Sequence, residues 1–151
     1  METLNAGEAN SMQYYGWELM TVTIDSGASE TVCGSMHFNN TDITESEGSR
    51  RGVKYRAANG EAIANLGQKT INFLTEEGSC RNMTSRVCEV TKPLASVSRI
   101  CKKGHRVVFE DGNKYIENLL TGELTRMREQ NGVYLLDIWI PPHEGFMRPG
   151  F

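Results

Sequence analysis

Alternating hydrophobic and polar positions run through most of the chain and predict strands rather than helices. The clearest case is residues 17–24, WELMTVTI, where Met20, Val22 and Ile24 fall on one face at a period of two. The chain is therefore expected to be all-β. The predicted strands cover residues 17–24, 53–58, 61–66, 69–75, 86–90, 106–110, 114–118 and 132–140.

Turn signals separate these segments, and one short helix interrupts them. Asn59-Gly60 and Asp111-Gly112 are strong hairpin signals, because both residue types in each pair tolerate positive φ. Residues 94–103, LASVSRICKK, have apolar positions near a spacing of 3.6 and predict a helix that stops at Gly104. The polar segment 39–52 predicts a surface loop or a second short helix.

The length of 151 residues fits one domain with a substantial core. It is too short for the two lobes of a large enzyme, so a site that needs two copies of one motif would take the second copy from another chain. The polar residues 1–13 are expected to be a flexible leader or linker, and residues 141–151 a linker tail.

Charge and composition exclude several classes of protein. Sixteen Lys and Arg against nineteen Asp and Glu give a net charge of -3, so binding of nucleic acid through phosphate neutralisation is not expected. No apolar run approaches the ~20 residues of a membrane span. The first residues lack the features of a secretory signal, and four cysteines do not form a disulfide framework. We therefore expect an intracellular protein with reduced thiols.

The segment that can carry chemistry is residues 21–34, TVTIDSGASETVCG. A strand delivers Asp25 into a loop of small residues, which allow backbone N–H groups to approach a carboxylate. For a bare Asp-Ser-Gly tripeptide, a strand followed by an ordinary turn is the simpler interpretation. The apolar strand before it, the Ala28-Ser29 pair after Gly27 and the glycine-tipped hairpin downstream favour a functional site.

Ile24-Asp25-Ser26-Gly27-Ala28-Ser29 resembles the Asp-Thr/Ser-Gly-Ala signature of retropepsins, the aspartic proteases of retroviruses and retrotransposons. The family's apolar-apolar-glycine triplet reads Leu94-Ala95-Ser96 here, and this serine occurs in the copia-type pattern. The resemblance to copia-type polyproteins covers roughly residues 21–140. It rests on further segments at residues 55–61 (YRAANGE), 92–98 (KPLASVS), 104–109 (GHRVVF) and 132–136 (GVYLL).

The resemblance implies a retropepsin-like closed β fold and a homodimeric aspartic endopeptidase. Residues 14–104 would form the protease core, and residues 105–140 a β extension similar to the segment before the integrase. Each chain would supply one Asp25. Two carboxylates in contact cannot both ionise, so the pair shares one proton. One carboxylate would activate a water and the other would donate a proton to the developing oxyanion.

The resemblance also implies roles for the neighbouring residues. Ser26 would hydrogen-bond across the dimer and support the pair of aspartates. The residues expected to bind substrate are Gly27, Ala28 and Ser29 in the cleft, and Ala58, Asn59 and Gly60 at the tip of a flap that closes over the peptide. The partners are a second copy of the chain and a polyprotein substrate, in the cytoplasm or a virus-like particle, with neither membrane nor nucleic acid involved. No metal or cofactor is expected.

Other interpretations are open at this point. The chain can be a catalytically inactive retropepsin-like module that dimerises or holds peptides, and Asn59-Gly60 can be an ordinary surface turn. Cys33-x3-His37 and Cys101-x3-His105 have spacings that could contribute to a zinc site or to a cysteine–histidine nucleophile pair, although neither spacing has a local signature.

Overall fold

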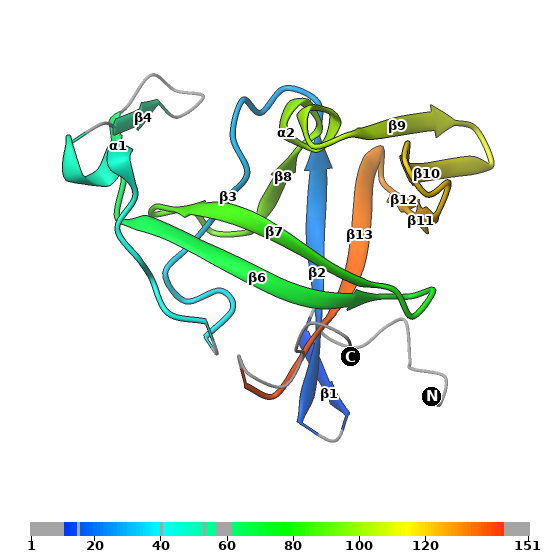
Figure 1. Cartoon of the computed structure of the whole chain (residues 1–151), viewed down its shortest axis with the longest axis horizontal. Coiled ribbons are helices and arrows are strands. Elements are labelled where there is room, and N and C mark those ends of the chain that lie inside the picture. The colour runs from blue at the N-terminus through cyan, green and yellow to red at the C-terminus, as the bar shows by residue number, and fades with distance from the viewer. Residues whose placement is uncertain (1–10, 15, 40, 53, 57–61, 144–151) are drawn as a thin grey trace.

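A computed structural model describes residues 11–14, 16–39, 41–52, 54–56 and 62–143. This part of the chain is mostly β, as predicted, and its helices are α1 (Glu47–Arg50) and α2 (Val97–Lys102) (Figure 1). The strands are β1 (Ser11–Tyr14), β2 (Trp17–Asp25), β3 (Val32–Cys33), β4 (Lys54–Arg56), β5 (Ala62–Ala64), β6 (Gly67–Thr75), β7 (Cys80–Val87), β8 (Leu94–Ser96), β9 (His105–Glu110), β10 (Asn113–Asn118), β11 (Leu124–Arg126), β12 (Arg128–Gln130) and β13 (Val133–Ile140).

The main sheet closes on itself. Its strand order is β1-β2-β8-β3-β7-β6-β13-β12, and β13 also pairs with β2, so that β2, β8, β3, β7, β6 and β13 form a ring. β2 and β13 run antiparallel, with Glu18 opposite Ile140 at one end and Ile24 opposite Tyr134 at the other. β9, β10 and β11 form a separate three-stranded sheet, and β4 pairs with β5. Because the ring is closed, most of its strand edges are paired rather than exposed.

The insertion of β8 between β2 and β3 is the feature of this topology that matters most for the site. β8 runs parallel to β2, with Thr23 opposite Leu94 and Asp25 opposite Ser96. On its other side Leu94 pairs antiparallel with Val32 of β3. β8, which follows the Asp25 loop by about seventy residues in sequence, is therefore hydrogen-bonded to the strand before this loop, β2, and to the strand after it, β3.

The alternating pattern of β2 matches its burial. Val22 is fully buried and Ile24 almost so, while Thr21 and Thr23 are partly exposed. This confirms the period-two prediction for residues 17–24. Val22 and Ile24 belong to one hydrophobic cluster, whose other buried members are Cys33, Phe38, Ile71, Phe73, Val87, Ala95, Ile116, Met127, Leu136, Ile138 and Ile140.

The helix prediction for residues 94–103 was only half right. Leu94–Ser96 is strand β8, because the sheet binds this segment between β2 and β3, and the helix begins after it. Ser96 is the N-cap: its side chain accepts from the Arg99 N–H. Gly104, at a φ of 89°, follows the last turn, in the left-handed conformation that glycine adopts readily. No helix in the described residues has the length and apolar character to cross a membrane.

Other differences from the predicted pattern arise from pairing at longer range. β7 is longer than residues 86–90, because its pairing with β6 extends back to Cys80. Residues 11–13, predicted as leader, belong to β1, which pairs with the first half of β2. The two hairpins predicted at residues 53–66 and 106–118 are present as β4–β5 and β9–β10, although the first is shorter than expected and its turn lies outside the described residues.

Candidate functional site

Asp25 is the last residue of β2 and lies half-buried where that strand leaves the sheet. The Gly27 N–H donates to Asp25 Oδ1 at 2.8 Å. A Cβ at Gly27 would lie 3.3 Å from the same oxygen, tighter than ordinary contact, so a larger residue here would require the carboxylate to shift by a few tenths of an ångström. Within the described residues Oδ2 has no hydrogen-bond donor. One oxygen of the carboxylate is thus oriented by the loop, and the other is left for another group.

The loop after Asp25 presents its small residues to solvent. Ser26, Gly27 and Ser29 are exposed, and Ala28 is partly exposed. The structure therefore brings Asp25 together with the predicted cleft residues in one accessible loop. Ser26 has no hydrogen-bond partner in the described part of the chain, so its predicted contact across a dimer stays a prediction.

The predicted flap residues Ala58, Asn59 and Gly60 lie outside the described residues. Their flanking strands are described: Lys54 pairs with Ala64 and Arg56 with Ala62. The β4–β5 hairpin and the end of β2 both lie toward the top of Figure 1. The antiparallel pairing of β4 with β5 is thus established, and the role of the segment between them as a flap stays a prediction.

Ser96 anchors the Asp25 loop through hydrogen bonds on the buried side of the loop. Its hydroxyl donates to the Ala28 carbonyl at 2.7 Å and accepts from the Arg99 N–H at 3.2 Å. Its own N–H donates to Thr31 Oγ1 at 3.0 Å, and the residue is fully buried. A glycine, which the retropepsin triplet has at this place, would lack the two hydroxyl contacts. The serine therefore adds a direct bond from β8 to the loop and a cap to α2.

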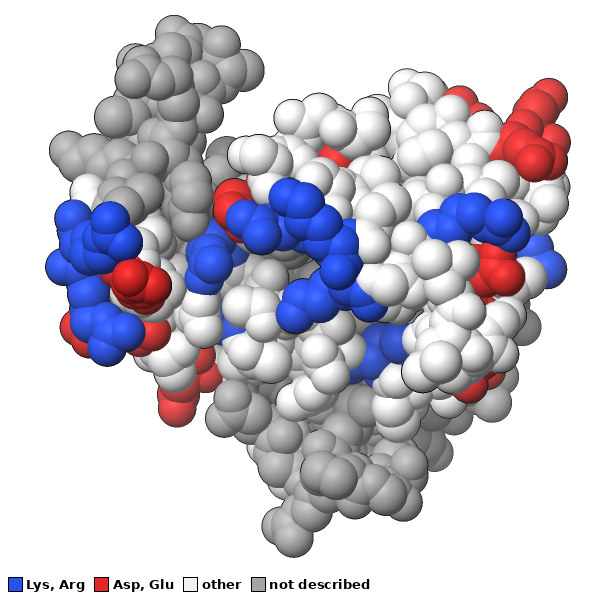
Figure 2. Space-filling view, turned by 45° about the horizontal axis from the view of Figure 1, so that its top comes forward, with Lys and Arg blue, Asp and Glu red and all other residues white. Residues whose placement is uncertain are grey.

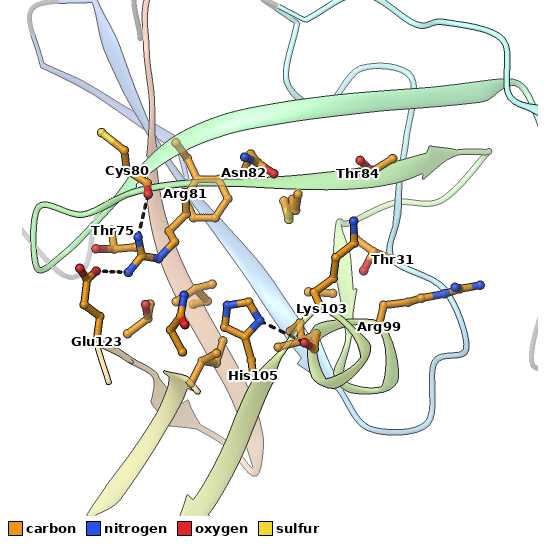
Figure 3. Close-up of a pocket in the computed structure, with 18 residues that line it drawn as sticks. Thr31, Thr75, Cys80, Arg81, Asn82, Thr84, Arg99, Lys103, His105 and Glu123 are labelled. Carbon is orange, nitrogen blue, oxygen red and sulfur yellow. Dashed lines mark hydrogen bonds and ion pairs between the residues drawn. The ribbon is translucent and has the colours of Figure 1, made fainter. Parts of the chain in front are cut away.

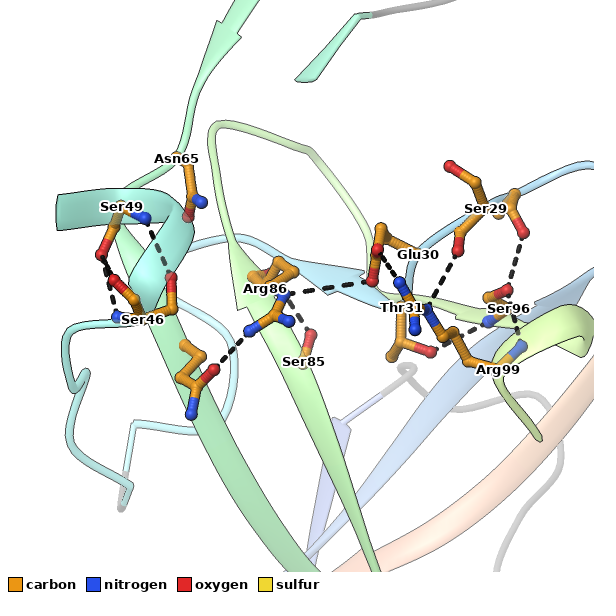
Figure 4. A network of polar contacts seen from close by, with 12 residues as sticks. Ser29, Glu30, Thr31, Ser46, Ser49, Asn65, Ser85, Arg86, Ser96 and Arg99 are labelled. Atoms are coloured by element: carbon orange, nitrogen blue, oxygen red, sulfur yellow. Dashed lines mark hydrogen bonds and ion pairs between the residues drawn. The ribbon is translucent and has the colours of Figure 1, made fainter. Parts of the chain in front are cut away.

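An ionic network continues this support along the surface (Figure 4). The Arg99 Nε–H donates to the Ser29 carbonyl at 3.3 Å, and Arg99 also forms an ion pair with Glu30. The other oxygen of Glu30 lies 3.9 Å from Arg86 Nε, and Arg86 bonds to Gln68. Because Arg99 holds both a backbone carbonyl and a side chain of the loop, it fixes the loop's position more firmly than an isolated surface ion pair would.

Sequence reasoning did not identify Ser96, Arg99 or Glu30 as parts of the site. The sequence contains one signal for Ser96, a serine where the retropepsin pattern that the sequence resembles has a glycine. Nothing near Arg99 in sequence points to residues 29 and 30. Only the placement of β8 beside β2 brings the start of α2 against the loop.

The loop that follows β3, residues 34–39, is held in a different way. The ammonium of the buried Lys69 donates to the carbonyls of His37 at 2.8 Å and Phe38 at 3.1 Å, and lies 3.5 Å from that of Ser35. Desolvation lowers the pKa of Lys69. Phe38 is itself buried and has a positive φ of 57°. These carbonyls replace water around the ammonium, so the lysine is a structural tie.

The hypothesis of a reactive Cys33–His37 pair fails on geometry and burial. Cys33 is fully buried, and desolvation raises its pKa, which disfavours the reactive thiolate. His37 Nδ1 accepts from the Gly34 N–H at 2.8 Å and is therefore occupied by the backbone. Among the described residues, no group of three or more His, Cys, Asp or Glu side chains is arranged to hold a metal ion. This loop is therefore part of the framework.

The segment predicted as an extension, residues 105–140, contributes directly to the ring of strands. β13 pairs with β2 along nearly its whole length and with β6 at Ile138 and Trp139. The partner of Ile24, the residue before Asp25, is Tyr134. The strand that carries Asp25 is consequently supported on one side by β13 and on the other by β8.

The described residues place one free carboxylate oxygen, exposed backbone and small side chains at the end of a rigid strand. Glu30, the nearest acidic residue in sequence, is engaged by Arg99. Within the described residues, the hydrogen bond of the Asp25 carboxylate is with the Gly27 N–H and not with a second carboxyl group. In comparisons with family models, curated proteins and solved structures, no match was found. The functional assignment therefore rests on the residues around Asp25.

Proposed function

We propose that this chain is an aspartic endopeptidase that cleaves a retroelement polyprotein, active as a homodimer with one Asp25 per chain. The observation that supports it most is the state of the Asp25 carboxylate: Oδ1 is held by the Gly27 N–H, and Oδ2 has no donor among the described residues. A group arranged in this way is oriented for proton exchange while remaining accessible, as a carboxylate that activates water requires.

In the proposed reaction the two Asp25 carboxyls share one proton. The ionised carboxylate takes a proton from a water molecule, whose oxygen attacks the scissile carbonyl carbon. The protonated carboxyl donates its proton to the carbonyl oxygen, which gives a tetrahedral diol. As the C–N bond breaks, the first carboxyl gives its proton to the leaving nitrogen and the second takes one from a hydroxyl of the diol, so that the amine and the acid are released and the pair again shares one proton. The exposed Gly27 and Ser29 and the partly exposed Ala28 offer backbone groups to an extended substrate. The water and the aspartates supply all the chemistry, and no cofactor takes part.

The proposed setting is intracellular, in the cytoplasm or within a virus-like particle, with neither a membrane nor nucleic acid as partner. It is supported by the net charge of -3 and by the four cysteines, all of which are free thiols. The buried Cys33 and Cys88 pack as small apolar residues.

The test is cleavage of a quenched fluorescent peptide library at mildly acidic pH. We expect cleavage that a pepstatin-type inhibitor blocks, that a chelator leaves unchanged and that Asp25→Asn reduces by about a thousandfold or more, because the substitution removes the shared carboxyl. Asp111→Asn is the matched control, since Asp111 is exposed in the turn between β9 and β10 and the asparagine suits that turn. Equal activity of Asp25→Asn and wild type would overturn the proposal.

A mixing experiment tests whether the site is shared between chains. Wild type and Asp25→Asn are unfolded together in equal amounts and refolded. The activity is compared with that of the same total amount of wild-type chain. If each active site needs two aspartates, about a quarter of that activity remains, whereas a site within one chain leaves about half. A folded dimer that binds peptide without cleaving it would instead establish the inactive peptide-binding module.

A further inference from the structure

A cavity of about 380 Å³ lies between the main sheet and the small sheet, beside α2 (Figure 3). It is separate from the exposed part of the Asp25 loop, and residues 25–30 do not line it. Side chains from β6, β7, α2, β9, β10, β11 and β13 contribute to its walls. Its volume falls in the range of small-molecule sites, roughly 300–1,000 Å³.

The inner wall of this cavity is apolar. Phe73 and Met83 come from the β6–β7 hairpin, Ile100 from α2, Ile116 from β10 and Leu136 from β13. Phe73, Ile116 and Leu136 are buried, whereas Met83 and Ile100 are partly exposed and so border open space. The cavity can therefore receive an apolar group of about the size of a leucine or phenylalanine side chain.

The lining of the cavity carries three permanent cations, and only one of them is uncompensated. Arg81 is paired with Glu123 and donates to the Cys80 carbonyl at 2.8 Å. Arg99 is paired with Glu30. Lys103 is exposed and has no ion-pair partner in the described part of the chain. Figure 2 shows lysine and arginine side chains gathered near the middle of the face that it draws. One unpaired cation matches a ligand with a single negative charge.

His105 adds a directional polar group. Its ring projects into the cavity, with Nδ1 3.2 Å from the Ile100 carbonyl oxygen (Figure 3). Because a carbonyl oxygen only accepts, Nδ1 carries the proton in this contact. Nε2 of the neutral ring is then an acceptor, which suits an N–H donor on a ligand.

We propose that this cavity binds an apolar amino-acid residue with a free carboxylate and an acylated nitrogen. The side chain would enter the apolar wall, the carboxylate would pair with Lys103 and the N–H would donate to His105 Nε2. Two sources share this chemistry: a free N-acyl amino acid and the C-terminal residue of a peptide. The proposal does not depend on the function proposed for Asp25.

The test is titration of the full chain carrying Asp25→Asn, so that no cleavage occurs, with acetyl-leucyl-phenylalanine and with its C-terminal amide. We expect saturable binding of the acid, followed by chemical-shift changes at the cavity residues, and at least tenfold weaker binding of the amide, because the charge-assisted contact is lost, a change of about 1.4 kcal/mol. Acetyl-phenylalanine and a pentapeptide ending in phenylalanine distinguish the two sources: tighter binding of the first favours a free N-acyl amino acid, and tighter binding of the second favours the C-terminal residue of a peptide.

Charge reversal at two adjacent lysines supplies the matched control. Lys103→Glu should weaken binding of the acid about tenfold or more. Lys102→Glu makes the same change in net charge on an exposed residue that does not line the cavity, and we expect a change below about threefold. Lys103→Gln gives a second, milder variant if the reversal lowers the melting temperature. Equal binding of acid and amide, equal effects of the two reversals, or no saturable binding would overturn the proposal.

Discussion

The loops on either side of β3 are held by opposite means. The loop before it, residues 25–31, is exposed at its tip and is fastened by Ser96 and Arg99, which bind its carbonyl groups from β8 and α2. The loop after it, residues 34–39, surrounds the buried ammonium of Lys69 and buries Phe38. One loop is arranged to present backbone to solvent, and the other to remove backbone from it.

The difference separates contacts that position the Asp25 loop, on which the proposed activity depends, from contacts that serve stability. Lys69 and the Phe38 carbonyl that it contacts are buried, so loss of the ammonium leaves a buried polar group without its donor. In the loop after Asp25, by contrast, Ser26, Gly27 and Ser29 are already exposed to solvent. Damage to their anchors should therefore affect the geometry of the Asp25 loop more than the free energy of unfolding.

Lys69→Met tests the stability half of this comparison and should have the largest effect. The thioether cannot donate to the carbonyls of His37 and Phe38, so the free energy of unfolding should fall by about 3 kcal/mol. Urea denaturation measures this loss. Lys92→Met, at an exposed lysine, should change it by less than about 0.5 kcal/mol. A loss at Lys69 no larger than at Lys92 would show that the lysine does not hold the loop.

Ser96→Ala tests the other half. It removes the hydroxyl contact to Ala28 and the cap of α2, so unfolding should become easier by about 1–2 kcal/mol. Peptide cleavage by the folded protein should fall by a further factor of about ten, because the loop carrying Asp25 loses its fastening. Ser98→Ala, at an exposed position on the same helix, is the control for both measurements. Unchanged turnover in folded Ser96→Ala would place this contact in the framework alone.

The smallest effect concerns pH and the loop after β3. Burial holds the pKa of His37 below its usual value of 6.5, and its neutral Nδ1 accepts from the Gly34 N–H. The unfolded chain therefore binds a proton at His37 more readily than the folded chain does. The contribution of the neutral histidine to stability is complete above pH 6.5 and is lost as the pH falls. His37→Asn keeps an acceptor oxygen and does not titrate. The free energy of unfolding of wild type, relative to that of this variant, should thus decrease between pH 7 and pH 5. A difference that does not change with pH would contradict the assignment.

Much of the fold follows from local pattern, and the exceptions have a common cause. Residues 17–24 and 132–140 are strands because their apolar positions alternate or run together, and the β9–β10 hairpin forms around Asp111-Gly112. The helical spacing of residues 94–103 was misleading over Leu94–Ser96, since pairing with β2 and β3 outweighs local propensity there. β1 likewise depends on β2 for its hydrogen bonds.

The candidate site divides in the same way. The sequence by itself determined that an apolar strand delivers Asp25 into a loop where glycine lets the backbone meet the carboxylate, because these effects act between near neighbours. Only the tertiary structure decided that Ser96 and Arg99 hold that loop, and that Lys103 and His105 border an apolar cavity. The contacts of Ser96 and Arg99 with the loop join residues far apart along the chain, and the pairing of β8 between β2 and β3, which no local pattern encodes, brings them together.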